Sequence, residues 1–249
     1  MVRTLLSPRW ILTHLAVALL IFLMINLGFW QLRRLDEKKT FNAVLRSHTS
    51  APLQTLDQAV PSGWNQKTSE WLRVRIIGTY DRKKAVTVIN RSQDGSAGFD
   101  SVVPFTSIDH RTILVNRGFV PLAMPVPEVP TEQREIVGYL RASQSRSALG
   151  AIDSVAAGNT EFQRFDIPLI SAHVGGTVEP MFLQLIEESP PANSQWPAKV
   201  ALPPLDEGPH LSYALQWFFF CLVAFTAWVV VVRRKILQVN ASTQEQTSA

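Results

Sequence analysis

Two long apolar runs, one near each end of the chain, dominate the pattern of hydrophobic and polar positions. The first extends from Trp10 to Phe29 and the second from Leu211 to Val232, and neither contains Asp, Glu, Lys or Arg. A helix needs about 20 apolar residues to cross a hydrocarbon core. The pattern therefore predicts transmembrane helices over residues 10–30 and 209–232, with residues 1–9 and 233–249 as tails.

The length of the first run distinguishes it from a cleavable signal peptide. Such a peptide has an apolar core of about 7–15 residues, followed by a small-residue cleavage site. The run from Trp10 is longer, and the segment Leu27-Gly28-Phe29-Trp30-Gln31 offers no such site. No basic, Ser-rich organelle presequence precedes it. We therefore expect an uncleaved span in a bacterial plasma membrane.

Between the two runs the pattern changes to short segments in which apolar and polar residues alternate or β-branched residues cluster. Such segments predict strands. Six are recognised: Trp71–Ile77, Ala85–Ile89, Phe99–Phe105, Thr112–Val115, Ile136–Leu140 and Met181–Ile186. Short strands in this number favour an antiparallel sheet or barrel. The predicted fold is thus a membrane protein whose two transmembrane helices flank one mainly-β, α+β extramembrane domain over residues 51–207.

Smaller features divide this domain. A short helix is expected over Ile167–His173. Turns or extended loops are expected at Asp94-Gly95, Asp109-His110, Pro121–Pro130 and Ala192–Pro204. The segment Asn116-Arg117-Gly118-Phe119 is interpreted as a strand end followed by a turn, where Arg117 either faces a cleft or makes structural hydrogen bonds. Residues 31–50 are expected to continue the first helix as a charge-mixed connector.

The basic residues at the two ends predict the topology. Arg3 and Arg9 precede the first span, and Arg233, Arg234 and Lys235 follow the second. The positive-inside rule then places both termini in the cytoplasm and the central domain outside it. Four basic residues at positions 33, 34, 38 and 39 oppose this assignment, but a long segment is translocated largely regardless of its charge.

A stripe of side chains at helical spacing marks the start of the second span. It comprises His210, Tyr213, Ala214, Trp217 and Cys221. One interpretation is an aromatic belt at the membrane interface, which explains Tyr213 and Trp217 but not His210. The other makes His210 an axial ligand of a membrane-soluble haem. His14, within the first span, is a further functional candidate, although it also suits a simple hydrogen bond to a partner.

The composition excludes several kinds of site. The net charge is +4, and 46% of the residues are hydrophobic. A single cysteine, Cys221, excludes intramolecular disulfides and Cys-ligated iron–sulfur clusters. The basic residues lie mostly beside the spans, without stacking aromatics elsewhere, so no nucleic-acid partner is expected. No pair of histidines has metal-chelating spacing, and no catalytic or nucleotide-binding motif occurs, so we do not expect an enzyme.

Three stretches, in this order, resemble the Surfeit locus protein 1 (Shy1-type) family of cytochrome c oxidase assembly factors. They are Leu27–Leu35 (LGFWQLRRL), Ile113–Pro121 (ILVNRGFVP) and His210–Phe218 (HLSYALQWF). Val74–Tyr80 is similar to the family's first domain strand. The likeness covers nearly the whole chain, except for Ser143–Ser171 and the polar tail from Asn240.

The resemblance implies a non-enzymatic factor that delivers or stabilises haem a while the oxidase core subunit, subunit I, matures. Haem a synthase is a further implied partner, besides the lipid bilayer. In the family, the histidine that opens the second span is linked to haem a, and His210 occupies that position here. His210 would then be an axial ligand of the haem iron. Candidates for the remaining haem contacts are Tyr213 and Trp217 at the ring or tail, Arg33 or Arg34 at a propionate, and Trp30.

Two alternatives remain open. A scaffold that binds an oxidase assembly intermediate without touching haem would have the same two-span layout. A membrane-tethered hydrolase or haem-modifying enzyme would require an active site assembled from distant residues. An optical spectrum of the purified protein, with and without a supply of haem a, distinguishes haem carriage from a haem-free scaffold.

Overall fold

The computed structural model of this chain describes residues 5–61, 63–153, 158–192 and 194–247. The chain divides into two compact units. The helical unit comprises Met1–Val44 and Pro204–Ala249, and the strand unit comprises Leu45–Pro203.

The helical unit is built from two long helices, α2 (Pro8–Thr49) and α6 (His210–Thr247). Both contain an apolar window long enough to span a membrane, and at most 6% of either window is buried. The core helix of a soluble protein would be mostly buried, so these windows are transmembrane segments. Helix α2 has 42 residues without a break, which is about 63 Å at 1.5 Å per residue. It therefore extends well beyond a hydrocarbon core of about 30 Å.

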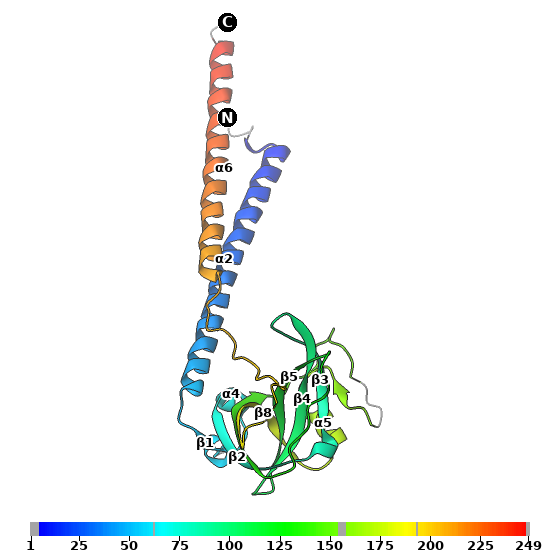
Figure 1. Cartoon of the computed structure of the whole chain (residues 1–249). Coiled ribbons are helices and arrows are strands. Elements are labelled where there is room, and N and C mark those ends of the chain that lie inside the picture. Colours follow the sequence, from blue (N-terminus) through cyan, green and yellow to red (C-terminus); the bar gives the residue numbers. More distant parts are fainter. Residues whose placement is uncertain (1–4, 62, 154–157, 193, 248–249) are drawn as a thin grey trace. The chain divides into compact units, whose positions relative to one another are not determined.

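The two helices meet along a heptad seam. On α2, buried or half-buried positions recur at alternating spacings of three and four: His14, Val17, Ile21, Met24, Gly28, Gln31 and Leu35. The corresponding positions on α6 are His210, Ala214, Trp217, Cys221, Ala224 and Trp228. This spacing is typical of coiled-coil packing. Contacts from His14 to Trp228 and from Ile21 to Cys221 show that the helices run antiparallel (Figure 1).

The strand unit confirms all six predicted strands. They are β2 (Arg73–Tyr80), β3 (Val86–Gln93), β4 (Ser96–Ser107), β5 (Thr112–Pro121), β6 (Arg134–Ala142) and β8 (Val178–Ser189). Two strands of two residues each, β1 (Gln54–Thr55) and β7 (Glu161–Phe162), are additional. The predicted short helix is α5 (Ile167–Val174). The remaining short helices are α3 (Leu56–Ala59), α4 (Gln66–Ser69) and the 3-10 turn η1 (Arg82–Lys84).

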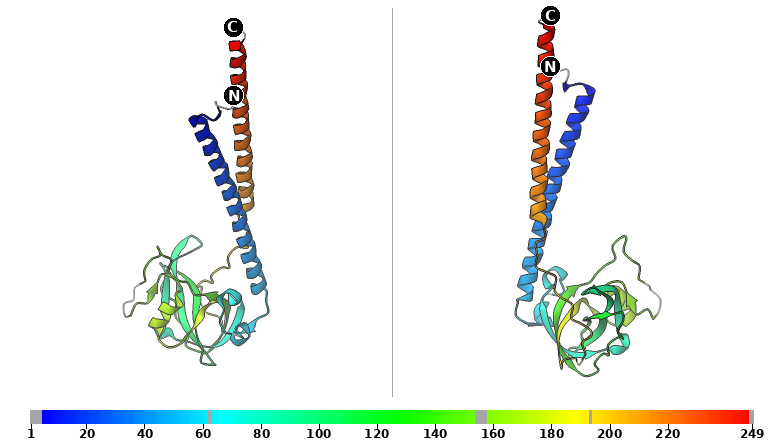
Figure 2. Two further views of the ribbon diagram at one scale, coloured as in Figure 1. Left: turned by 180° about the vertical axis from the view of Figure 1, so that it is seen from behind. Right: turned by 45° about the horizontal axis from the view of Figure 1, so that its top comes forward.

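The sheet closes on itself as a barrel. Its strand order is β1-β2-β6-β8-β5-β4-β3-β7, and an additional pairing joins β2 to β4. Strands β2, β6, β8, β5 and β4 therefore form a closed ring (Figure 2). The ring is antiparallel apart from the β5–β8 pair, which is parallel. The observed architecture, two transmembrane helices and one mainly-β domain, confirms the predicted fold class.

Two apolar clusters form the core of the strand unit. The larger includes Val74, Phe105, Ile136 and Leu183 from four strands of the ring. The second joins β3, β4 and β5 to α5, where the rings of Phe165 and Phe182 are stacked with their centres 4.3 Å apart.

The prediction of a strand end and turn at Asn116-Arg117-Gly118-Phe119 is wrong. Strand β5 continues to Pro121, and Arg117 is the extra residue of a bulge, since Ser101 pairs with Gly118 whereas Val102 pairs with Asn116. Gly118 has a φ of +133°, and a Cβ there would lie 2.2 Å from the Ala198 carbonyl oxygen. The local signals resemble those of a turn, but pairing with β4 keeps the chain in the sheet.

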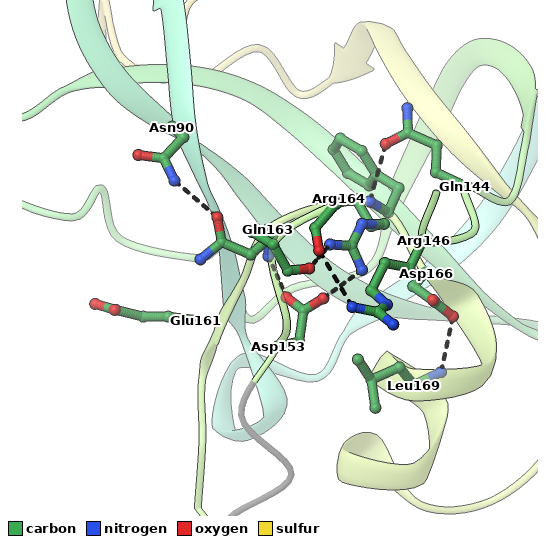
Figure 3. A network of polar contacts seen from close by, with 12 residues as sticks. Asn90, Gln144, Arg146, Asp153, Glu161, Gln163, Arg164, Asp166 and Leu169 are labelled. Carbon is green, nitrogen blue, oxygen red and sulfur yellow. Dashed lines mark hydrogen bonds and ion pairs between the residues drawn. The ribbon is translucent and has the colours of Figure 1, made fainter. Parts of the chain in front are cut away.

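A polar network fixes the segment for which the family resemblance gave no alignment (Figure 3). Arg164 Nη1 donates to Asp153 Oδ2 at 2.6 Å, and Asn90 Nδ2 donates to Gln163 Oε1 at 2.7 Å. The Asp166 side chain caps α5 by accepting from the backbone N–H of Leu169. These contacts satisfy buried charges locally, so the network has a structural role.

Candidate functional site

His210 is the first residue of α6, immediately after the segment Gly208-Pro209. Proline is favoured near a helix start because its fixed φ suits the first turn. Gly208 has a φ of +65°, which favours glycine. The chain before α6 is fastened to α2, since Asn42 Nδ2 donates to the Asp206 carbonyl at 3.0 Å and Lys39 pairs with Glu207 at 3.8 Å. Local sequence and these two contacts together place the imidazole beside α2.

A hydrogen bond from α2 orients the His210 ring. Nδ1 of His210 lies 2.9 Å from Oε1 of Gln31. An amide oxygen only accepts, so Nδ1 carries the hydrogen and donates it. In the neutral imidazole, the lone pair is then on Nε2. Gln31 thus selects the tautomer whose Nε2 can bind a metal.

The Nε2 edge of His210 faces a residue without a side chain. A Cβ built on Gly208 would lie 3.4 Å from both Nε2 and Cδ2 of His210. Any other residue at position 208 would therefore place a carbon in van der Waals contact with the edge that carries the lone pair. The glycine leaves that side of the ring open.

A hollow of about 320 Å³ adjoins His210. It is lined by Arg34, Glu37, Lys38, Phe41 and His210. Nη1 of Arg34 donates to Glu37 Oε2 at 2.7 Å, and both side chains are exposed. The Trp30 ring lies 6.0 Å from Arg34 Cζ. The five lining residues therefore supply one imidazole, two cationic groups, one carboxylate and the aromatic ring of Phe41.

The other residues predicted for this site lie outside the hollow. Arg33 is exposed and is not among its lining residues. Tyr213 is 48% exposed and Trp30 is 45% exposed. Trp217 is half-buried on the seam and contacts Phe220, with the ring centres 6.1 Å apart. The structure thus brings His210 together with Arg34, and with Trp30 only through its contact with Arg34.

Two small residues, Ala214 and Cys221, complete the stripe. Ala214 is fully buried, so no flat ligand can lie against it. Cys221 is half-buried, with its sulfur 3.8 Å from the Ile21 carbonyl oxygen. This part of the stripe is helix packing.

His14 has a partner across the seam. Nε1 of Trp228 donates to Nδ1 of His14 at 3.1 Å, and the two rings meet edge to face. Among the residues that the structure describes, no group of three or more His, Cys, Asp or Glu side chains could hold a metal ion.

Gln31 and Gly208 are the site residues that sequence reasoning missed. Gln31 lies inside the stretch Leu27–Leu35 used for the family resemblance, whereas Gly208 lies outside the stretches that carry it. The heptad spacing from Gly28 to Gln31 to Leu35 is a signal that could have placed the amide on the helix-facing side of α2.

Comparison with known proteins identifies relatives along most of the chain. A sequence model described as the SURF1 family matches residues 18–222. An uncharacterized SURF1-like protein of Mycobacterium tuberculosis is 28% identical over 227 residues, covering 88% of this chain and 82% of its own length. A SURF1-like protein of Rickettsia felis is 27% identical over 235 residues, covering 91% and 99%. Surfeit locus protein 1 of Takifugu rubripes is 24% identical over 234 residues, covering 85% and 93%. Because this match runs from inside the first span, through all the strands, into the second span and covers most of the chain, this chain belongs to the SURF1 family.

Proposed function

We propose that this protein is an assembly factor for haem–copper cytochrome c oxidase that binds haem a through His210. It would deliver or stabilise the haem while subunit I of the oxidase matures, with haem a synthase as the donor. Membership of the SURF1 family supports the assembly role. The observation that carries the haem assignment is the His210 imidazole, whose Nδ1 is engaged by Gln31 and whose Nε2 edge faces Gly208.

The donor set fits a transiently held haem. Iron in haem proteins is commonly held by a histidine nitrogen. A hydrogen bond donated by the other ring nitrogen fixes the orientation of the ring and raises the basicity of the ligating nitrogen. Gln31 supplies that bond. One axial imidazole leaves the opposite coordination position free for the acceptor, which suits handover of the cargo.

The hollow beside His210 fits an edge of the porphyrin. Its volume of about 320 Å³ lies at the lower end of small-molecule pockets, which span roughly 300–1,000 Å³. It would take the edge that carries the propionates. Arg34 is the candidate partner of a propionate, because a guanidinium binds carboxylates in a bidentate manner. Glu37 holds the Arg34 side chain in the free protein and would be exchanged for the propionate.

The expected topology suits this cargo. With both termini in the cytoplasm of a bacterial cell, the strand unit is extracytoplasmic and His210 lies at the outer end of its span. The isoprenoid tail of haem a requires an apolar environment, and the outward faces of α2 and α6 adjoin the bilayer.

An optical spectrum tests the proposal directly. The full chain is purified in detergent from cells that make haem a, and the Soret absorbance per protein is measured for the wild type, His210→Ala and Gln31→Leu. We expect His210→Ala to lose the absorbance. Gln31→Leu should bind haem a about tenfold more weakly, as is typical when the hydrogen-bond partner of a ligating histidine is removed.

His14→Ala is the matched control, since it removes the other intramembrane histidine of the seam and should keep the absorbance. Undiminished absorbance in His210→Ala contradicts the proposal. A wild-type protein that co-purifies with subunit I but carries no haem would instead favour the haem-free scaffold.

A further inference from the structure

Arg117, at the bulge of β5, is a buried cation that forms no ion pair with the residues the structure describes. It is 2% exposed. Its Nη1 donates to the Glu128 carbonyl at 3.1 Å, and the Tyr80 ring centre lies 5.5 Å from its Cζ. Its Nε is buried and has no hydrogen-bond partner among the described residues. None of the ion pairs formed within the described ranges includes Arg117.

Two hollows meet at Arg117. One has a volume of about 420 Å³ and also contains Lys199, Glu187 and Glu188. The other has a volume of about 540 Å³ and also contains Arg82 and Arg134. The second hollow therefore has three guanidinium groups on its wall.

The carboxylates around the second hollow do not neutralise Arg117. Glu132 is engaged by Arg134 through a hydrogen-bonded ion pair. Glu128 contributes its backbone carbonyl to Arg117, and its residue is exposed. The remaining polar group at Arg117 is Tyr80, whose pKa is raised by burial and then by Glu188, so it is a neutral phenol. The positive charge is thus matched only by neutral contacts on this side.

The first hollow is more nearly balanced. Glu187 and Glu188 line it together with Lys199 and Arg117. Desolvation lowers the pKa of Lys199, Arg117 lowers it further, and Glu188 opposes both effects. The first hollow thus sets two cations against two carboxylates, whereas the second sets three guanidinium groups against Glu128 and Glu132, so the second is the better site for an added anion.

We propose that the second hollow binds a carboxylate, with Arg117 as its principal ligand and Arg82 as a second. A buried guanidinium is costly unless an anion pairs with it, and its planar array of N–H donors matches a carboxylate in a bidentate manner. Pro127, Val129 and Trp196 also line this hollow, so its apolar wall would accept the carbon skeleton that carries the carboxylate. That group would come from a small organic acid or from an acidic side chain of a polypeptide.

Thermal unfolding of the full chain in detergent tests this inference. The midpoint Tm of the strand unit is measured in sodium succinate and in sodium chloride at the same ionic strength. A ligand at about ten times its Kd raises Tm by about 3–5 °C in a unit of this size. Acetyl-Ala-Ala-Glu-Ala-Ala-amide and its Gln counterpart test the polypeptide source. The proposal is supported if succinate raises Tm above chloride, or if the Glu peptide raises it above the Gln peptide. Whichever of the two carboxylates acts at the lower concentration shows whether the ligand is a small organic acid or a polypeptide side chain.

Three arginine variants test whether the carboxylate binds in the second hollow. Arg117→Gln should abolish the carboxylate-specific rise, and Arg82→Gln should reduce it. Arg75→Gln is the control, since Arg75 is an exposed arginine of β2 that pairs with Glu135 at 3.9 Å, and it should keep the full rise.

The proposal is overturned if neither carboxylate raises the wild-type Tm above its control. It is also overturned if Arg117→Gln keeps the rise, or if Arg75→Gln loses it equally. Should Arg117→Gln fail to fold, Arg82→Gln decides, because Arg82 is exposed and its replacement should leave the fold intact. A carboxylate-specific rise in Tm that is unchanged in Arg82→Gln overturns the proposed site.

Discussion

The strand unit and the helical unit place their apolar side chains in opposite directions. In the strand unit, large apolar side chains such as Phe105, Leu114 and Leu183 are fully buried. In the helical unit, Phe22 and Phe219 point outward, whereas His14, Gln31 and Trp228 face the seam. The helical unit thus exposes large apolar side chains of the kind that the strand unit buries, and its seam includes polar side chains among apolar ones.

The difference follows from the solvent of each unit. Water drives apolar side chains into the barrel, whereas lipid is as apolar as leucine and provides no such force between helices. Helix association in a membrane depends instead on close packing and on interhelical hydrogen bonds. The seam therefore carries polar side chains. At the His210 end of the seam, the bond between Gln31 and His210 fixes the orientation of the imidazole.

The largest expected effect contrasts two phenylalanines. Phe105→Ala should lower the free energy of unfolding of the strand unit by about 3–5 kcal/mol, because Phe105 is 0% exposed and its removal leaves a cavity. Phe219→Ala removes the same ring from a position 60% exposed on α6 and should change that free energy by less than about 0.5 kcal/mol. Denaturant unfolding of the full chain in detergent, followed by near-UV circular dichroism, measures both. Equal losses would contradict the contrast.

A smaller effect is expected where the two helices approach closely. A Cβ at Gly28 would lie 2.6 Å from Cε1 of the Phe218 ring, and Phe218 is itself packed edge to face against Phe29. Gly28→Val should therefore destabilise the helix pair by about 1–3 kcal/mol, as overpacking does. SDS-induced unfolding in mixed micelles measures the change.

Leu27→Val is the control for Gly28→Val, because Leu27 is exposed beside it on α2. If the control loses as much stability as Gly28→Val, close packing at the seam is not what holds the helices together.

The smallest expected effect concerns the hydrogen bond between Trp228 and His14. Double-mutant cycles in another membrane protein give about 0.6 kcal/mol for an average interhelical hydrogen bond. A cycle with Trp228→Phe and His14→Phe, measured by the same SDS unfolding, should give a coupling energy of that size. A coupling of zero would show that the bond has no part in helix association, and one of several kcal/mol would make it the main contact of the seam.

Much of the secondary structure could be predicted from the sequence. The two spans follow from apolar runs. The six strands follow from alternation, as in Trp71–Ile77, and from β-branched clusters, as in Ala85–Ile89, which the structure forms as Arg73–Tyr80 and Val86–Gln93. The two-residue strands β1 and β7 were not predicted, because a strand of two residues is too short to show an alternation of apolar and polar positions. The Asn116–Phe119 segment was assigned wrongly, since its asparagine and glycine give a turn signal that pairing with β4 overrides.

For the candidate site too, some residues could be named from the sequence and others could not. His210 and Arg34 were named from the sequence, and the structure brings both to one hollow. The orienting bond from Gln31 and the open edge at Gly208 were missed, because each depends on where one segment lies against another.

The type of most segments could be inferred from the chain alone, because hydrophobic period, run length and turn residues are properties of neighbouring positions. Which segments meet could not: examples are the β2–β4 pairing that closes the barrel, the register of α2 against α6, and the burial of Arg117 between two hollows. These outcomes depend on contacts between residues far apart in the chain, where many weak interactions are optimised together and no local pattern specifies the partner.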